Sequence, residues 1–253
     1  MGWLDPDSGE FTGSGIASLY PDLRTAILGR YRRGQLVTGA SARVTGVSWH
    51  EGILQPSFEK MSNDEFRQRV STKTDIGVHP HLRDPYESQM VEVTQSSITG
   101  SGEGLQVRTD VEAGTIVAFY HGLRMSAKEE NPFGRSTGYG IFLEWDRDKR
   151  DKADVLDLSP EVLYQKDIKK KKIANNHIKL QSTKNYTATL AHKVNHSFNP
   201  NCEWVHALHP CYGKVPAIKT CEDLRKGDEL FIHYGFDMDE APQWYKDFWM
   251  KQE

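Results

Sequence analysis

Two segments in the C-terminal third of the chain constrain its fold most strongly. The first, NHSFNPNC at Asn195–Cys202, gathers turn-forming Asn, Ser and Pro residues around one Phe. The second, ELFIHYGFD at Glu229–Asp237, is an apolar strand that ends in Tyr-Gly. Turn-forming residues let two backbones approach closely while their polar groups stay paired. Together the segments raise the question of what would need a polar turn and an aromatic-tipped strand close together.

Short strands alternate with turns from Tyr86 onward. The segment LQVRTDVEAGTIVAFYHG predicts one strand, a turn at residues 112–114 and a second strand over Thr115–Tyr120. GSGEGL at Gly100–Leu105 lies between strands, where a plain tight turn is the default interpretation. The sequence contains no Gly-rich phosphate loop before a helix and no nucleophile elbow. The predicted fold class is therefore mainly β.

The first 45 residues contain a weak repeat. SGEFTG at Ser8–Gly13 recurs loosely as RGQLVTG at Arg33–Gly39, and each copy places apolar residues between Gly-bearing turns, as short hairpins do. Two copies are few, so coincidence is one interpretation. A β-sheet that was once part of a longer repeat array fits the pattern best.

Two helices are predicted within this mainly β chain. Ser62 and Glu65 have the spacing of a capping box, which predicts a short helix beginning at Ser62. EAPQWYKDFWMKQE predicts a closing helix with Pro242 in its first turn. This closing helix carries two aromatic pairs with a spacing of four, Trp244 with Phe248 and Tyr245 with Trp249. Four aromatic residues on one terminal helix indicate that it covers part of the protein.

Composition and charge narrow the function classes. Of the 253 residues, 37% are hydrophobic and 10% aromatic, so a folded core is expected. The formal net charge of −3 excludes a generally basic nucleic-acid binder and suits a basic substrate. No apolar run reaches membrane-spanning length and no signal peptide is recognisable, so no membrane association is expected. Three Cys residues are too few for a disulfide framework, which favours an intracellular compartment.

Residues 147–185 interrupt the strand pattern with a charged, Lys-rich segment. Between Lys166 and Lys184 there are seven Lys and one Asp, and Lys169–Lys172 form one run. A lysine run can serve as a nuclear-import signal or as a phosphate-binding patch. A solvated insertion loop is the third interpretation, and it is favoured over either of the others alone.

The segment CEWVHALHPC raises the question of a zinc site. It offers four possible ligands, namely Cys202, His206, His209 and Cys211. Their spacing is irregular, and alternation along a strand would point these side chains in different directions. A buried core thiol is the alternative for Cys202.

Four motifs in a fixed order resemble those of the SET-domain protein lysine methyltransferases: GSGEGL, AFYHG, NHSFNPNC and DELFIHYGF. The resemblance covers about Pro85 to the C-terminal end. YPDLRTAILGRYRRGQLVTG is similar to the end of the MORN repeats in the branch that monomethylates lysine four of histone H3 and many non-histone proteins. No Cys-rich tail follows HYGFD, which agrees with that branch and weakens the zinc interpretation.

The resemblance implies a SET fold of small sheets in which the Tyr-Gly strand threads through a loop as a pseudoknot. It implies four regions along the chain: a β-hairpin, MORN-like remnant at 1–50, a flanking segment with a short helix at 51–84, the catalytic domain at 85–237 with its charged insertion at 147–185, and a C-terminal aromatic helix at 238–253.

The resemblance also implies S-adenosyl-L-methionine as the cofactor. By their places in the motifs, the binding residues would be Ser101, Gly102, Glu103, Asn195, His196 and Trp244. The first three would hold the methionine part largely through backbone, the Asn-His pair would hold the amino-acid end and the adenine, and the Trp would stack on the adenine. A purely structural histidine is the alternative for His196.

For the transfer itself, the resemblance implies two catalytic tyrosines, Tyr234 beside the methyl group and Tyr120 at the amine. A buried core tyrosine is the alternative for each. Trp204 and Phe236 stand where the similar branch has tyrosines that line the lysine channel. A bulky indole favours monomethylation, because it leaves little room for a second methyl group.

The implied partners are the histone H3 tail and other basic protein segments, with nucleic acid contacted at most indirectly through Lys169–Lys172. The implied location is the nucleus, in association with chromosomes, and the cytoplasm is a second possibility. No resident metal is expected. The alternative function is a SET-like binding module that has lost its activity.

Overall fold

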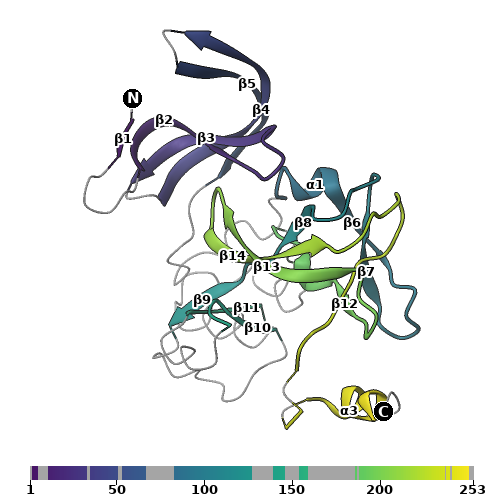
Figure 1. Cartoon of the computed structure of the whole chain (residues 1–253). Helices are drawn as coiled ribbons and strands as arrows, with labels where there is room; N and C mark the ends of the chain where they lie inside the picture. Colours follow the sequence, from purple (N-terminus) through teal and green to yellow (C-terminus); the bar gives the residue numbers. More distant parts are fainter. Residues whose placement is uncertain are drawn as a thin grey trace, which may run out of the picture.

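The computed structural model describes residues 2–4, 11–32, 35–50, 53–66, 83–126, 139–145, 154–158, 186, 188–236, 238–239 and 241–250. An N-terminal antiparallel sheet is followed by a body of small sheets, and a short helix lies at the C-terminal end (Figure 1). The prediction of a mainly β fold of small sheets with an N-terminal β-repeat and a closing helix is confirmed. Among the described residues, no helix is long and apolar enough to cross a membrane.

The N-terminal sheet is a meander in which each strand pairs with the next. Its strands are β1 (Gly2–Leu4), β2 (Phe11–Leu19), β3 (Thr25–Arg32), β4 (Gln35–His50) and β5 (Ile53–Phe66). Gly29 of β3 lies opposite Gly39 of β4. A Cβ on Gly29 would lie 2.4 Å from Leu36 Cδ1 and 2.6 Å from the Thr38 carbonyl oxygen. The close approach of β3 to β4 at this position therefore requires glycine. The hairpins that the weak repeat predicts are therefore present.

The helix predicted to begin at Ser62 is wrong where the structure describes it. Residues 62–66 continue strand β5, and Glu65 pairs with Ala40 of β4. The capping-box spacing is a local preference, and pairing with a long neighbouring strand overrides it. The rest of the predicted helix lies outside the described residues.

The described residues of the body form three short antiparallel sheets and one parallel pair of strands. Helix α1 (Glu87–Met90) leads into the pair β6 (Val91–Gln95) and β7 (Glu103–Val107). The central sheet has the order β13 (Cys202–His209), β14 (Gly213–Thr220), β8 (Ile116–Phe119). The third sheet has the order β10 (Gly140–Phe142), β11 (Asp154–Asp157), β9 (Leu123–Ser126).

The parallel pair joins the two segments that constrain the sequence most. After the 3₁₀ helix η4 (Ala191–Lys193), strand β12 (Asn195–His196) pairs with β15 (Phe231–Ile232). Asn195 lies opposite Phe231, and His196 lies opposite Ile232. The polar turn and the aromatic-tipped strand therefore lie side by side, as the resemblance implies.

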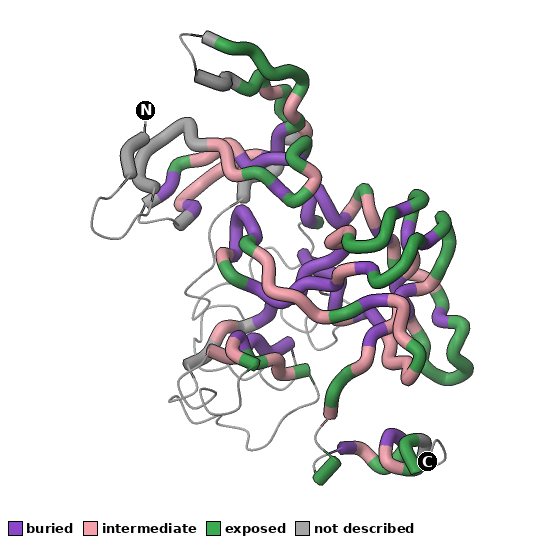
Figure 2. The backbone as a smooth tube through the Cα atoms, in the orientation of Figure 1, coloured by how far each residue is buried: buried purple, intermediate pink, exposed green. Residues whose placement is uncertain are grey.

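The core of the body surrounds strand β8. Val117, Ala118 and Phe119 of this strand are fully buried, and Figure 2 shows buried backbone concentrated where β8, β13 and β14 meet. The predicted turn before β8 is present, because Gly114 has a φ of 84° and Thr115 N–H donates to the Glu112 carbonyl. The predicted strand Thr115–Tyr120 corresponds to β8 with one residue fewer at each end.

Helix α3 (Gln243–Trp249) is the closing helix, with Pro242 immediately before it. The Pro242 carbonyl accepts the N–H of Tyr245, so the proline lies at the start of the first turn, as predicted. Tyr245 and Trp249 stack, with ring centroids 6.1 Å apart. The Lys169–Lys172 run lies outside the described residues, and within 147–185 the described part forms β11.

Candidate functional site

The β6–β7 loop, residues 96–102, forms one wall of the candidate site. Ser96 N–H donates to the Gly102 carbonyl at 2.8 Å, which closes the loop, and Ser101 N–H donates to the Ile98 carbonyl at 3.1 Å. Gly100 and Gly102 have φ values of 85° and 74°, which favour glycine. Ser101 and Gly102 are exposed at the end of this loop.

The predicted cofactor residues Glu103 and Asn195 are in direct contact. Asn195 Nδ2 donates to the Glu103 carbonyl at 3.0 Å and lies 3.5 Å from Glu229 Oε1. The Glu103 carboxylate forms an ion pair with Lys193 Nζ at 2.6 Å, and the Lys193 side chain is only 6% exposed. Strand β7 and the η4–β12 segment are thus tied together beside the loop.

His196 lies at the centre of an aromatic cluster. Its ring centroid is 5.1 Å from that of Tyr245, 5.3 Å from that of Tyr234 and 5.7 Å from that of Trp244. Burial, with a further contribution from His233, lowers the pKa of His196 from its ordinary value of 6.5 to about 4. Its Nδ1 accepts the Tyr234 N–H at 3.1 Å, so at neutral pH the ring proton lies on Nε2. Nε2 is buried and has no hydrogen-bond partner among the described residues.

Helix α3 brings Trp244 to this cluster. Tyr245 is buried and its hydroxyl lies 3.1 Å from His233 Nε2, which anchors the helix on the β15 segment. Trp244 is 51% exposed and lies beside His196. The prediction that the aromatic helix covers part of the protein is therefore correct.

The hydroxyl groups of Tyr234 and Tyr120 each donate a hydrogen bond to a backbone carbonyl. The Tyr234 hydroxyl donates to the Val194 carbonyl at 2.9 Å, and the Tyr120 hydroxyl donates to the Tyr139 carbonyl at 2.5 Å. Burial, followed by the neighbouring Tyr139, raises the pKa of Tyr234 to about 12. Burial also raises the pKa of Tyr120 well above its ordinary value, and Tyr234 is among its neighbouring phenols. Both hydroxyls thus stay protonated at neutral pH, and both oxygens keep lone pairs that can accept a hydrogen bond.

The two predicted channel residues lie beside different tyrosines. Trp204 meets Tyr120 edge to face, with ring centroids 5.9 Å apart. Phe236 meets Tyr234 in the same manner at 5.5 Å, and it also lies 6.2 Å from Trp244. The predicted residues therefore form two neighbouring groups. The first contains the two tyrosines and Trp204, and the second contains His196 and Trp244. Phe236 contacts Tyr234 of the first group and Trp244 of the second.

The four Cys and His residues of the zinc interpretation have other surroundings. His209 Nε2 lies 2.9 Å from Asp84 Oδ2, and its Nδ1 accepts the N–H groups of Cys211 and Tyr212. Cys202 is buried in the core, in line with the alternative interpretation for this thiol. Among the described residues, no group of three or more His, Cys, Asp and Glu side chains is placed to hold a metal ion.

Sequence reasoning missed several groups of this site. The carbonyl oxygens of Val194 and Tyr139 have no sequence signature, because every residue carries one. Lys193 directly precedes Val194 and Asn195 and could have been noticed there as a charge beside a motif. Glu229 belongs to the DELF segment and could have been noticed as an acidic residue entering an apolar strand.

The residues present fit S-adenosyl-L-methionine. The buried Nε2 of His196 offers a donor without a partner among the described residues, and the half-exposed ring of Trp244 offers a flat surface for a purine. The Asn195 amide and the backbone of the β6–β7 loop supply further polar groups on the adjacent side.

Comparison with known proteins agrees with this geometry. A family model described as "SET domain" matches residues 102–235. The chain is 34% identical over 251 residues to "Histone-lysine N-methyltransferase SETD7" of Halocynthia roretzi. The matched region covers 94% of this chain and 58% of that protein. The chain thus spans less than two thirds of the length of this curated relative.

Solved structures give a weaker likeness. An autoinhibited apo form of ctPRC2 is 18% identical, covers 65% of this chain and 17% of that chain, and has a TM-score of 0.39. Chaetomium thermophilum Polycomb Repressive Complex 2 bound to GSK126 is 18% identical, covers 64% and 17%, and has a TM-score of 0.40. TM-scores this low do not establish a shared fold or function. On the family model, which matches more than half of its residues, the chain belongs to the SET-domain family.

Proposed function

We propose that the protein is an S-adenosyl-L-methionine-dependent protein lysine N-methyltransferase. The observation that carries this proposal is a pair of phenols, Tyr120, which is buried, and Tyr234, which is 36% exposed, whose protons are both given to backbone carbonyls. Phenol oxygens in that state can only accept further hydrogen bonds, so they would orient the N–H groups of a lysine amine. The amine lone pair would then be free to point at an electrophile.

The cofactor would lie between the β6–β7 loop and helix α3. Ser101, Gly102 and Glu103 would contact its methionine part, Asn195 and His196 its amino-acid end and adenine, and Trp244 would stack on the adenine. When bound, it supplies a methyl group carried on a sulfonium cation.

The lysine must lose a proton before it can react. A free lysine has a pKa of about 10.4, so its neutral form costs about 4–5 kcal/mol at neutral pH. Tyr234 cannot remove this proton at neutral pH, because its own pKa is raised to about 12. Desolvation beside Tyr120, Trp204 and Phe236 favours the neutral amine instead, and a nearby positive charge adds to this preference.

The substrate we propose is a basic protein segment, with the histone H3 tail at its fourth residue as the first candidate and non-histone proteins as others. Support comes from the histone-lysine methyltransferase of Halocynthia roretzi, to which the chain is 34% identical. We propose monomethylation as the product, because the Trp204 indole lies directly against Tyr120. A nuclear, chromosome-associated location follows from such a substrate.

The test is incubation of the protein with labelled S-adenosyl-L-methionine and mixed histones, followed by identification of the labelled residue. Label on a lysine side chain supports the proposal. Cofactor binding without transfer to any protein substrate would favour the alternative, an inactive SET-like binding module. Absence of cofactor binding would contradict both the enzyme and its cofactor site.

A further inference from the structure

The Glu229 carboxylate lies beside the start of the β6–β7 loop and accepts several hydrogen bonds. Its Oε1 accepts the Ser96 hydroxyl at 2.6 Å. Its Oε2 accepts the Ser97 N–H at 2.7 Å and the Ser97 hydroxyl at 2.6 Å. Asn195 Nδ2 approaches Oε1 at 3.5 Å from the opposite side. One carboxylate therefore joins the start of the loop to strand β12.

The backbone around Glu229 is held equally firmly. Asn201 Nδ2 donates to the Glu229 carbonyl at 2.8 Å, and Asn201 Oδ1 accepts the Phe231 N–H at 2.8 Å. Leu230 N–H donates to the Leu105 carbonyl of β7 at 2.7 Å. The carboxylate thus extends from a fixed backbone toward the more exposed loop.

Gly104 makes room for this arrangement. A Cβ at position 104 would lie 2.3 Å from Glu229 Oε1 and 3.3 Å from the Ser96 Cα. Gly104 does not have a positive φ, so its lack of a side chain is explained by the approach of the carboxylate and not by its backbone conformation.

The charge state of Glu229 suits a carboxylate that only accepts hydrogen bonds. Burial raises the pKa of Glu229, but the hydrogen bonds from Ser96, Ser97 and Asn195 outweigh burial and leave the pKa below its ordinary value. A neutral amide could not replace it, since an NH₂ group at the Oε2 position would face the Ser97 N–H. At the Oε1 position, an NH₂ group would face a second donor, the Asn195 amide Nδ2, at 3.5 Å.

We propose that Glu229 is a positioning residue that fixes the β6–β7 loop and the Asn195 amide in the geometry that binds the cofactor. This inference rests on the proposed function. Glu229 acts through Asn195 and through the loop that carries Ser101 and Gly102, and it does not itself touch the cofactor.

The experiment compares the full chain with Glu229→Gln and uses two readouts. Calorimetric titration with S-adenosyl-L-methionine should show about tenfold weaker binding, the factor that corresponds to about 1.4 kcal/mol. Amide hydrogen exchange of the cofactor-free protein should become faster at Ser97 and across the loop. With a histone H3 peptide, KM for the cofactor should rise while KM for the peptide stays unchanged, which a general loss of stability would not produce.

Two further variants separate the carboxylate from its surroundings. Glu92→Gln is the matched control, because Glu92 lies on β6, accepts Gln106 Nε2 at 3.0 Å and makes no hydrogen bond with the loop. It should bind cofactor like the wild type. Gly104→Ala should weaken binding by displacing the carboxylate, and in a Glu229→Ala background the same change should have a much smaller effect, because the group it displaces is gone.

The outcomes are distinct. If the wild type binds cofactor and Glu229→Gln matches it in affinity and in loop exchange, the positioning role is overturned and the proposed function stands. If Gly104→Ala weakens binding equally in both backgrounds, Gly104 acts directly and the role of Glu229 is again overturned. If the wild type does not bind S-adenosyl-L-methionine, the proposed function fails, and the role assigned to Glu229 fails with it.

Discussion

At the scale of single residues, the candidate site depends on where protons are held. Tyr120 and Tyr234 give theirs to carbonyl groups, and His196 Nδ1 accepts a backbone N–H, so its Nε2 carries the ring proton. Burial shifts the pKa of each group in the direction that keeps it uncharged. The described residues of the candidate site therefore position uncharged donors and acceptors.

The Tyr234 hydroxyl can be tested by Tyr234→Phe. We expect kcat to fall about 100-fold or more, the scale for losing one oriented hydrogen-bonding group, while cofactor affinity stays nearly unchanged. Steady-state kinetics on a single-lysine peptide and calorimetry measure the two quantities. Tyr31→Phe is the control, since Tyr31 lies in the N-terminal sheet and its hydroxyl is 3.5 Å from the Pro210 carbonyl. Unchanged turnover in Tyr234→Phe would remove this residue from the mechanism.

Trp204 can be tested through the number of methyl groups added. The wild type should give mainly monomethyl-lysine, because the indole lies edge to face against Tyr120 and overfilling a tight site costs about 1–3 kcal/mol. Trp204→Phe should raise the dimethyl fraction, since the smaller ring leaves room for a methylated amine to turn. Mass spectrometry of the peptide reads both outcomes. A wild type that already forms di- or trimethyl-lysine would mean that Trp204 is only a core residue.

At the scale of elements, helix α3 and strand β15 form one unit around His196. The Tyr245 hydroxyl lies 3.1 Å from His233 Nε2, and the Tyr245 ring centroid lies 5.1 Å from that of Phe198, so the buried side of the helix is fixed on the segments after β12 and after β15. Trp244, on the same helix, stays half exposed. Anchoring and ligand contact are thus divided between neighbouring residues of one short helix.

This division predicts different results for different aromatic residues. Trp244→Ala should weaken cofactor binding by about 1–3 kcal/mol, the scale for a lost stacking partner, with little change in the melting temperature. Trp49→Ala is the matched control, because Trp49 is 74% exposed on β4 of the N-terminal sheet. Calorimetric titration gives both affinities. Wild-type affinity in Trp244→Ala would place the adenine elsewhere.

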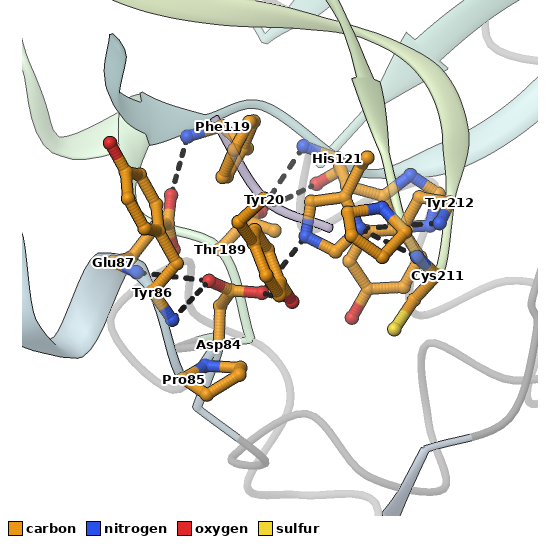
Figure 3. Close-up of polar contacts among 12 residues, drawn as sticks. Tyr20, Asp84, Pro85, Tyr86, Glu87, Phe119, His121, Thr189, Cys211 and Tyr212 are labelled. Carbon is orange, nitrogen blue, oxygen red and sulfur yellow. Dashed lines mark hydrogen bonds and ion pairs between the residues drawn. The ribbon is translucent and has the colours of Figure 1, made fainter. Parts of the chain in front are cut away.

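At the scale of the whole molecule, buried polar side chains join the N-terminal sheet to the body (Figure 3). The Asp84 carboxylate accepts the Tyr20 hydroxyl at 2.5 Å and faces His209 Nε2 at 2.9 Å. Its other oxygen accepts the N–H groups of Tyr86 and Glu87 at the start of α1. The Glu87 carboxylate in turn accepts the N–H groups of Phe119, next to Tyr120, and of Leu190. The N-terminal sheet is thereby connected to strand β8, which directly precedes Tyr120, a proposed catalytic tyrosine.

Tyr20→Phe tests this connection. The free energy of unfolding should fall by about 1.5–3 kcal/mol, because a buried hydrogen bond to a charged group is lost while the ring still packs against Tyr86. Denaturant unfolding followed by Trp fluorescence measures it. Thr38→Val, on the same sheet but away from Asp84, is the comparison and should change stability less. Equal losses in the two variants would show that Tyr20 contributes only as a member of its sheet.

Local patterns predicted much of this molecule, and long-range pairing accounts for the rest. The Glu112–Gly114 turn, strand β8 and the closing helix all follow from residues close together in sequence. The helix at Ser62 failed because β4 captures that segment into a sheet. Tyr20, Asp84 and His209 are separated by 64 and 125 residues, and nothing in the sequence near any of them indicates the others.

The parallel pairing of β12 with β15 has a consequence for the newly made chain. Asn195 and His196 meet Phe231 and Ile232 only after the intervening hairpin of β13 and β14 has been synthesised. Pairings between distant segments form late in folding, because the loop between them must first be closed. A ribosome-bound chain that stops before Phe231 would lack the strand that pairs with β12 and so would have no cofactor site. Ligand-dependent protection from protease should therefore arise on the ribosome only after α3 has emerged.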